Sequence, residues 1–167
     1  MHQLIARLMP VLLLLAACAA PEPPAPPLRD IAKPMYSTAS FSAGMLIGNW
    51  SQVGEVTRSP GCGPGQMSVT PTATELVIDW QLCLDGALRS GHGNLKPTGP
   101  GRFDVPGSDV PWWVLWSDAD GRTLVLGTPS GAFGIVLDRG RIPADRAKAA
   151  ADILAWNGYD MRLLHLP

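Results

Sequence analysis

Side chains that could do chemistry are scattered along this chain, and none stands in a motif that a catalytic or metal site needs. Ser130 lies in Thr-Pro-Ser-Gly, which lacks the glycine that precedes the nucleophile in a hydrolase elbow. His92 stands between two glycines, with no acid beside it in the sequence to orient it. Asp118 and Asp120 begin like a calcium loop, but no glutamate follows at the twelfth position. We therefore predict no enzyme activity, no cofactor and no metal site.

Cys18 has the most specific setting of any residue in the chain. It ends Leu15-Ala16-Ala17-Cys18, after a short apolar stretch that cannot cross a bilayer as a helix. We therefore interpret 1–17 as a signal peptide. The four residues resemble the lipobox of bacterial lipoproteins. That resemblance implies cleavage before Cys18, acylation of this residue with chains such as palmitate, and, because Ala19 is not acidic, delivery to the outer membrane on its periplasmic side. The alternative is an ordinary secretory signal with an incidental cysteine.

The remaining cysteines, Cys62 and Cys83, would lie in an oxidising compartment once the chain is exported. With Cys18 acylated, they are the available pair, and we predict one disulfide between them. Such a bridge closes a loop of about 20 residues and contributes about 3 kcal/mol to stability in the chain-entropy model. Two reduced, buried thiols are the alternative. A zinc site is less favoured, because two cysteines supply half of the ligands that zinc needs.

Composition limits the classes of partner and the number of domains. The chain has 13 basic and 14 acidic residues, so no positive excess is available for phosphates and we predict no nucleic-acid binding. The length fits one compact domain after removal of the signal. Six prolines crowd 19–34, a composition typical of an extended spacer. We predict a tether over 18–40 and a folded domain over 41–167.

Within that domain, short segments alternate between apolar and polar side chains. The segment 76–84 is the clearest, with Ile78, Trp80 and Leu82 on one side and polar residues on the other. Further strand-like segments follow at near-constant spacing, with turns such as Asp85-Gly86 between them. The pattern predicts an all-β antiparallel meander, and hence a barrel or a sandwich.

One helix is predicted near the end of the chain, at about 143–157. Pro143 suits the first turn, and Asp145 would lie near the positive end of the helix dipole. The alanine-rich centre has high helix propensity, and Gly158 suits a left-handed cap.

Three short motifs give this order of elements a known counterpart. Gly48-Asn49-Trp50 resembles the glycine-x-tryptophan signature on the first strand of lipocalins. Leu137-Asp138-Arg139 resembles the end of their last barrel strand, and Asn157-Gly158-Tyr159-Asp160 resembles the helix exit of bacterial outer-membrane lipocalins. The resemblance covers roughly 46–166. It implies an antiparallel, lipocalin-like up-and-down barrel with one C-terminal α-helix.

The resemblance also implies a structural pair that closes the narrow end of the barrel. The guanidinium of Arg139 would lie over the indole of Trp50, a cation–π contact that contributes about 0.5–2 kcal/mol. The alternative is that Arg139 is a solvated charge at the end of a strand.

Even spacing places several apolar side chains where a barrel cavity would be. The candidates to line a ligand are Ile78, Trp80, Leu82, Val114 and Trp116. A core filled by these same side chains is the alternative, because small barrels adopt either arrangement.

The sequence therefore gives two functional hypotheses. The first is a lipid-anchored protein of the outer membrane that binds a small apolar ligand, a fatty acid or lysolipid, in its barrel. The second is a structural or protein-interaction lipoprotein of the envelope with a filled barrel and no ligand. No residue pattern names a protein partner.

Overall fold

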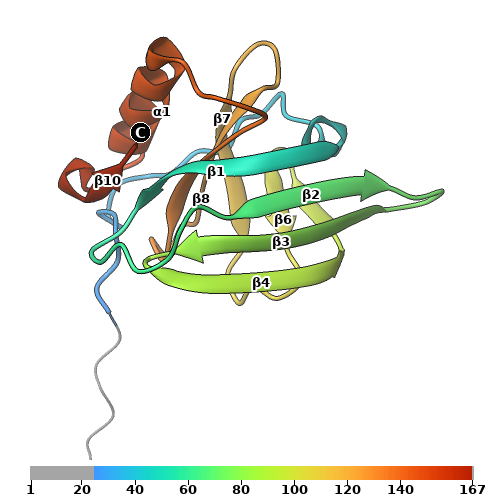
Figure 1. Ribbon diagram of the computed structural model, residues 1–167, viewed down its shortest axis with the longest axis horizontal. Helices are drawn as coiled ribbons and strands as arrows, with labels where there is room; N and C mark the ends of the chain where they lie inside the picture. The colour runs from blue at the N-terminus through green and yellow to red at the C-terminus, as the bar shows by residue number, and fades with distance from the viewer. Residues whose placement is uncertain (1–24, 167) are drawn as a thin grey trace, which may run out of the picture.

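The computed structural model describes residues 25–166, which form a β-barrel with one helix on its outside (Figure 1). The predicted signal peptide, Cys18 and the first part of the predicted tether lie outside the described residues. In chain order the elements are η1 (Ala43–Leu46), β1 (Gly48–Val56), β2 (Gln66–Pro71), β3 (Leu76–Leu84), β4 (Ala87–Asn94), β5 (Lys96–Gly99), β6 (Arg102–Asp104), β7 (Trp112–Ser117), β8 (Thr123–Gly127), β9 (Gly134–Asp138), α1 (Ala144–Trp156), η2 (Met161–Leu163) and β10 (Leu164–His165). The predicted all-β fold with one C-terminal helix is confirmed.

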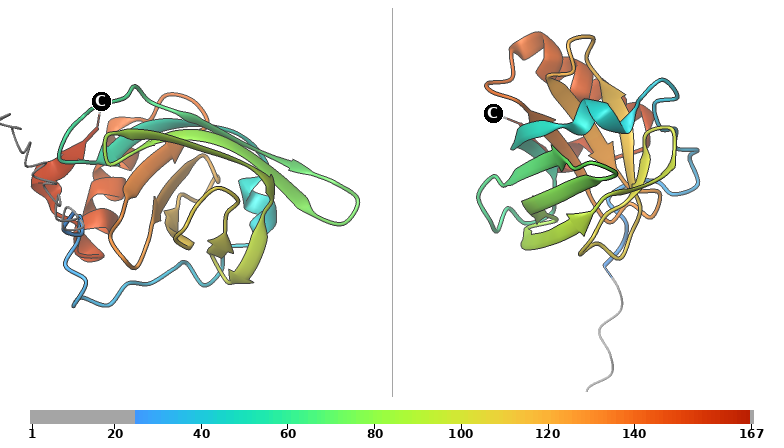
Figure 2. Two further views of the ribbon diagram at one scale, coloured as in Figure 1. Left: turned by 90° about the horizontal axis from the view of Figure 1, so that it is seen from below. Right: turned by 90° about the vertical axis from the view of Figure 1, so that its right-hand side faces the viewer.

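The strands form one antiparallel sheet that curves into a nearly closed barrel. Neighbouring strands follow the order β4-β3-β2-β1-β9-β8-β7-β6-β5, and β10 pairs with the last residues of β1. Only Leu95 separates β4 from β5, so the chain itself joins the two ends of this order. The long strands curve strongly when the barrel is seen from below (Figure 2). The predicted meander is therefore a barrel and not a sandwich.

Two apolar clusters hold the barrel and the helix together. One fills the inside of the barrel, and the other lies between the outer face of the sheet and α1. β8 contributes to both because its side chains alternate: Leu124 and Leu126 point inward, and Val125 lies outside beneath the helix. All residues of β8 and β9 are buried, which explains why their sequences are almost continuously apolar.

The helix α1 begins and ends where the sequence predicts. Pro143 is its N-cap residue, and Asp145 lies in the first turn. Ala150 and Leu154 are buried against the sheet. Gly158 follows the helix with a φ of +86°, a left-handed conformation that favours glycine. Among the described residues, no helix is both long enough and apolar enough to cross a membrane.

The predicted boundary between tether and domain at residue 41 is too late. Leu28 is buried in the outer apolar cluster, and Arg29 is 5% exposed. The Arg29 guanidinium donates to the carbonyl oxygens of Asn157 at 2.8 Å, Pro129 at 2.9 Å and Lys33 at 2.5 Å. The proline-rich sequence gave no sign of this contact, because two residues such as Leu28 and Arg29 are too few to show a periodic pattern. The folded domain therefore begins at about Leu28.

The glycines of β4 have a structural cause in the loop that precedes β7. This loop, 105–111, folds against β4, and a Cβ at Gly91 would collide with the carbonyl oxygen of Pro106. Gly93 has a φ of +147° and lies beside the Pro106 ring. β6 has three residues and makes two pairs with β7, and the loop that follows it packs against β4.

Candidate functional site

Arg139 and Trp50 lie together at the end of the barrel that η1 covers. The guanidinium carbon of Arg139 is 3.9 Å from the centre of the Trp50 ring. Arg139 also donates to the carbonyl oxygens of Met45 at 3.0 Å, Ile47 at 2.8 Å and Gly121 at 2.9 Å. The guanidinium therefore connects the segment before β1, the β7–β8 turn and the end of β9. The Trp50 indole N–H donates to Leu46, which holds η1 across this end.

Aromatic side chains fill the interior of the barrel. The rings of Trp80 and Trp112 meet edge-on with centroids 5.0 Å apart, and Trp112 and Phe133 meet in the same way at 5.3 Å. The loop 105–111 satisfies both indoles, since Trp80 donates to the Pro106 carbonyl and Trp112 donates to the Ser108 hydroxyl, each at 2.9 Å. The remaining space is about 10 Å³, roughly enough for one water molecule.

Four of the predicted lining residues belong to this filled core. Ile78, Trp80, Leu82 and Val114 are all buried in the inner cluster. They face inward as predicted, but the space between them holds no ligand-sized cavity in this structure. Alternation along a strand gives the direction of each side chain and does not reveal whether opposite side chains meet in the middle.

The predicted place of Trp116 is wrong. It packs in the outer cluster, on the other face of the sheet from Val114. The register between β7 and β8 shifts between these two residues: Val114 faces Leu126, whereas Trp116 faces Val125. An extra residue at such a bulge reverses the direction of every side chain that follows.

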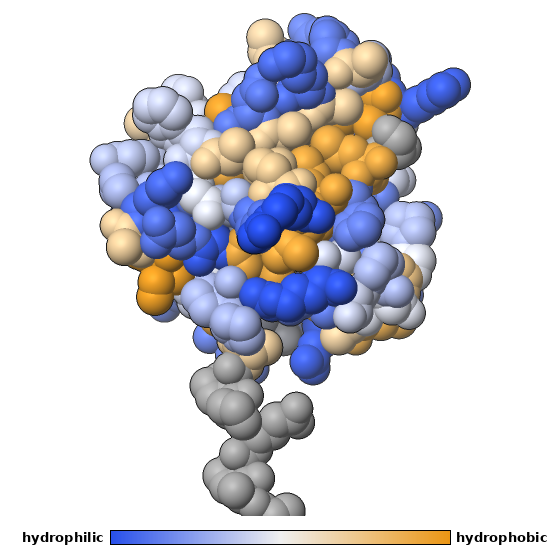
Figure 3. Space-filling view, turned by 90° about the vertical axis from the view of Figure 1, so that its left-hand side faces the viewer, coloured by the Kyte–Doolittle hydropathy of each residue, from blue (hydrophilic) through white to orange (hydrophobic). Residues whose placement is uncertain are grey.

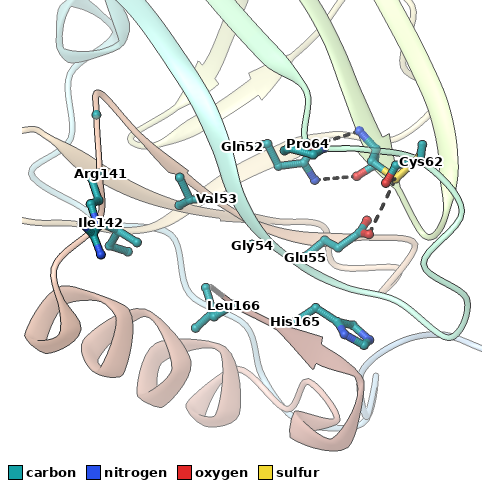
Figure 4. A pocket seen from close by; sticks show the side chains of 12 residues that line it. Gln52, Val53, Gly54, Glu55, Cys62, Pro64, Arg141, Ile142, His165 and Leu166 are labelled. Atoms are coloured by element: carbon teal, nitrogen blue, oxygen red, sulfur yellow. Dashed lines mark hydrogen bonds between the residues drawn. A yellow bond between two sulfur atoms is a disulfide. The ribbon is translucent and has the colours of Figure 1, made fainter.

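Several ligand-sized openings lie on the described surface, including one of about 660 Å³ beside Asn49 and Asp79 and one of about 620 Å³ beside Pro71 and Glu75. Two others are candidate sites for an apolar ligand. The first is the mouth of the barrel, a space of about 380 Å³ whose floor includes Trp80 and Phe133. The second is a groove of about 470 Å³ along the end of β1, which we call the outer groove (Figure 4). Its walls are Gln52, Val53, Gly54, Glu55, Cys62, Pro64, Cys83, Gly140, Arg141, Ile142, His165 and Leu166. Apolar surface is also visible between hydrophilic side chains on the end of the molecule that carries α1 and β10 (Figure 3).

The outer groove exists because β2 pairs with only the first part of β1. The paired residues end at Ser51 and Gln66, and the chain between them leaves the sheet. β10 pairs with β1 farther along, at Glu55 and Val56. Gly54 permits the close approach of β10, because a Cβ there would collide with the Leu166 side chain. The groove therefore lies between the departing loop, the edge of β1 and the C-terminal strand.

A disulfide and a buried glutamine hold one wall of the groove. Cys62 and Cys83 are bonded, with Cα atoms 5.7 Å apart, which confirms the predicted pair. Gln52 bridges β1 and β3 where β2 is absent. Its side-chain nitrogen donates to the Cys83 carbonyl at 2.7 Å, and its oxygen accepts from the N–H groups of Cys83 at 2.8 Å and Gly65 at 3.1 Å.

Glu55 is the unusual group in this wall. It is 9% exposed, and its Oε1 lies 3.6 Å from the disulfide sulfur of Cys83, which has no proton to donate. Within residues 25–166, Oε2 is buried without any hydrogen-bond partner. Burial raises the pKa of Glu55, His165 opposes this, Asp85 adds to it, and the N–H of Gly86 opposes it. Sequence reasoning missed Glu55 and Gln52, because polar residues in a half-exposed strand carry no distinguishing signal.

The acidic residues that resembled a calcium loop have a structural role. Asp118 accepts from the N–H groups of Arg122 and Thr123 and from Arg146 of α1 at 3.0 Å. Burial alone would raise the pKa of Asp118, but these hydrogen bonds outweigh it and lower the pKa. In the part of the chain that the structure describes, no three His, Cys, Asp or Glu side chains gather as a metal site would require.

Comparisons with known proteins identify the fold. No protein-family model matches the sequence, and no curated protein matches it. The solved structures that resemble it include lobster apocrustacyanin A1, with a TM-score of 0.53 and 16% identity over 74% of this chain and 77% of that one. The cockroach allergen Per a 4 has a TM-score of 0.57 and 11% identity over 79% and 92%. The siderocalin Ex-FABP, which functions through dual ligand specificities, has a TM-score of 0.53 and 11% identity over 73% and 93%. At these identities the likeness shows the fold alone, which is the lipocalin fold.

Proposed function

We propose that this protein binds a small apolar ligand in the outer groove, while a lipid on Cys18 holds it at the outer membrane. The groove carries the proposal, because about 470 Å³ between mostly apolar walls matches the size of a small-molecule site. The interior of the barrel, at about 10 Å³, has no room for an acyl chain. The proposal keeps the expected ligand, a molecule with an apolar chain, and moves its site to the outer face.

The binding energy would come from covering the apolar walls of the groove. Val53, Ile142 and Leu166 line its centre, and each 100 Å² of apolar surface removed from water contributes about 2.5 kcal/mol. The ligand specificities of the siderocalin Ex-FABP further support a ligand-binding role for a barrel of this kind.

The membrane anchor in this proposal rests on the sequence around Cys18. The described residues are consistent with an anchored domain, because the fold begins at about Leu28, shortly after the cysteine. Mass spectrometry of protein purified from membranes would test the anchor: acyl chains on an N-terminal Cys18 support it, and an unmodified or earlier-cleaved terminus contradicts it.

Binding of a fluorescent acyl probe tests the ligand proposal. We expect Leu166→Glu to abolish the response, because a charge would enter the apolar centre of the groove. Leu88→Glu is the matched control, since Leu88 is 55% exposed on β4 and does not line the groove. A probe that responds equally in both variants, but not after Ala132→Trp at the barrel mouth, would move the site to the mouth. A protein that binds no probe and carries no lipid from membranes would contradict ligand binding.

One observation favours a second candidate function. The indoles of Trp80 and Trp112 are packed and fully hydrogen-bonded inside the barrel, an arrangement suited to a rigid scaffold. We propose, as the alternative, a structural or interaction protein of the envelope. Cross-linking in intact cells that captured one partner through the barrel surface, together with absence of any bound ligand, would favour this alternative.

A further inference from the structure

The outer groove contains a carboxylate with one oxygen that accepts no hydrogen bond from the described residues. The Glu55 side chain is more than nine-tenths buried, and Oε2 has no partner among residues 25–166. A buried carboxylate normally accepts hydrogen bonds or pairs with a cation, because removing it from water is costly. Here the carboxylate lies beside the disulfide, and the apolar side chains of the groove lie farther along it (Figure 4).

The nearby cationic groups do not neutralise Glu55. Arg58 pairs with Asp85 at 3.3 Å and donates to the carbonyls of Pro26 and Pro27, so its donors are already engaged. His165 faces Glu55 in the β1–β10 pair, and the described residues include no ion pair between them. Because Arg58 and Asp85 compensate each other, the ionised Glu55 carboxylate leaves a negative charge at this end of the groove.

Arg141 lies at the opposite end of the groove, away from Glu55 (Figure 4). Its side chain is exposed, so water and salt screen its charge. Glu55 is buried, where the effective dielectric is lower and a charge acts more strongly. An anionic head group would gain little at Arg141 and would be repelled near Glu55, whereas a cationic head group would be attracted to the Glu55 carboxylate, whose Oε2 has no partner among residues 25–166.

We propose that the ligand of the outer groove is an amphiphile that carries a protonated amine. The ammonium group donates to Glu55 Oε2, and the apolar chain lies along Val53, Ile142 and Leu166. The inference rests on the proposed function of the groove and adds the chemistry of the head group. It requires no covalent step.

Calorimetric titrations with three probes of equal chain length test the inference. Octylamine, octanol and sodium octanoate are added, below micellar concentrations, to the mature chain carrying Cys18→Ser, which removes the acylation site. We expect octylamine to bind at least tenfold more tightly than octanol, and octanoate to bind most weakly. Glu55→Gln should make octylamine and octanol equal. Glu75→Gln is the matched control, because Glu75 is exposed immediately before β3 and its replacement should leave the preference intact.

The outcomes separate this inference from the function on which it rests. Equal binding of the three probes, or an amine preference that persists in Glu55→Gln, overturns the amine inference and leaves a ligand-binding groove. No binding of any probe overturns both. An independent measurement on the unsubstituted side chain is the NMR shift of the Glu55 carboxyl carbon. It should move as octylamine is added and remain still with octanol, and a still signal with both probes contradicts the inference.

Discussion

Arg139 shows how one side chain can join three parts of a fold. It stacks on Trp50 and donates to carbonyl oxygens before β1 and in the β7–β8 turn. Its planar guanidinium permits both kinds of contact at once, which a lysine ammonium would not. Closure of this end of the barrel therefore depends on a residue that lies largely at the surface.

We predict that Arg139→Ala lowers the free energy of unfolding by about 2 kcal/mol, because the cation–π contact and the hydrogen bonds to three carbonyl oxygens are lost. For a chain of this length the melting temperature should fall by about 4–8 °C in a calorimetric scan. The exposed Arg89 on β4 offers a control, and Arg89→Ala should melt like the parent. An unchanged melting temperature in Arg139→Ala would contradict a stabilising role for Arg139.

Glu55 should make stability depend on pH in a defined direction. Its folded pKa is raised above the ordinary value of 4.5, so the folded state holds the proton more tightly. Stability contributed by the protonated form is present below pH 4.5 and is lost as the pH rises through the folded pKa. Asp85 strengthens this effect, whereas His165 and the Gly86 N–H weaken it.

We therefore predict that Glu55→Gln gains stability over the parent as the pH rises from 4 to 7, with little difference at pH 4. Urea unfolding at both values measures this. Glu75→Gln should show no such trend, and a Glu55→Gln variant whose advantage shrinks toward pH 7 would contradict the assignment of a raised pKa.

At the scale of residues, functional groups could be predicted where the neighbouring sequence defines them. They could not be predicted where residues far apart in the chain create their surroundings. Cys62 and Cys83 could be paired because few cysteines exist to choose from. Gln52 and Glu55 could not be recognised, because their surroundings come from a gap in pairing between β1 and β2. The gap depends on where β2 leaves the sheet, and the sequence around Glu55 does not indicate that position.

Among the elements, the strands and the helix were predictable where the pattern is regular. β3 follows its alternation, and α1 ends at the glycine that suits its cap. β7 did not follow its alternation past Val114, because the bulge against β8 sends Trp116 outward to the helix side. Two adjacent apolar residues before Trp116 are compatible with a bulge or with a regular strand, and only the pairing partner decides between them.

The disulfide fixes an element that the sheet alone does not hold. It ties the loop after β1 to β3 across the position that β2 has left. We predict that replacing Cys62 and Cys83 together with serine costs about 3 kcal/mol, since the unfolded chain gains the freedom of the released loop. The melting temperature should fall by about 6–12 °C, and a reducing agent should lower that of the parent but not of the variant. Equal melts for parent and variant would contradict this role.

At the scale of the whole molecule, the sequence predicted a barrel but did not decide whether its interior is hollow or filled. Inward-facing positions such as Ile78 and Trp80 are the same in a hollow and in a filled barrel. The interior is filled because Trp80, Trp112 and Phe133 meet across it, and this depends on their rotamers and on the loop 105–111. These long-range contacts join parts of the chain that no local pattern relates.

We predict that Trp112→Ala opens a binding cavity inside the barrel, at a cost of about 3–5 kcal/mol in stability. Added indole should bind in the space and restore part of the lost melting temperature, as apolar cavities accept small aromatic molecules. Trp156→Ala is the control, because Trp156 is 75% exposed and its removal should create no site. A Trp112→Ala protein that indole does not stabilise would show that the neighbours collapse into the gap.

Leu28 and Arg29 belong to the folded domain, so they also limit its distance from the lipid that we propose on Cys18. Seven peptide steps separate Cys18 from Ala25, and a fully stretched chain of that length spans about 25 Å. With the proposed lipid on Cys18, the start of the domain would therefore stay within about 25 Å of the membrane surface. An apolar ligand that leaves the bilayer would then cross only a short distance of water before it reaches the outer groove.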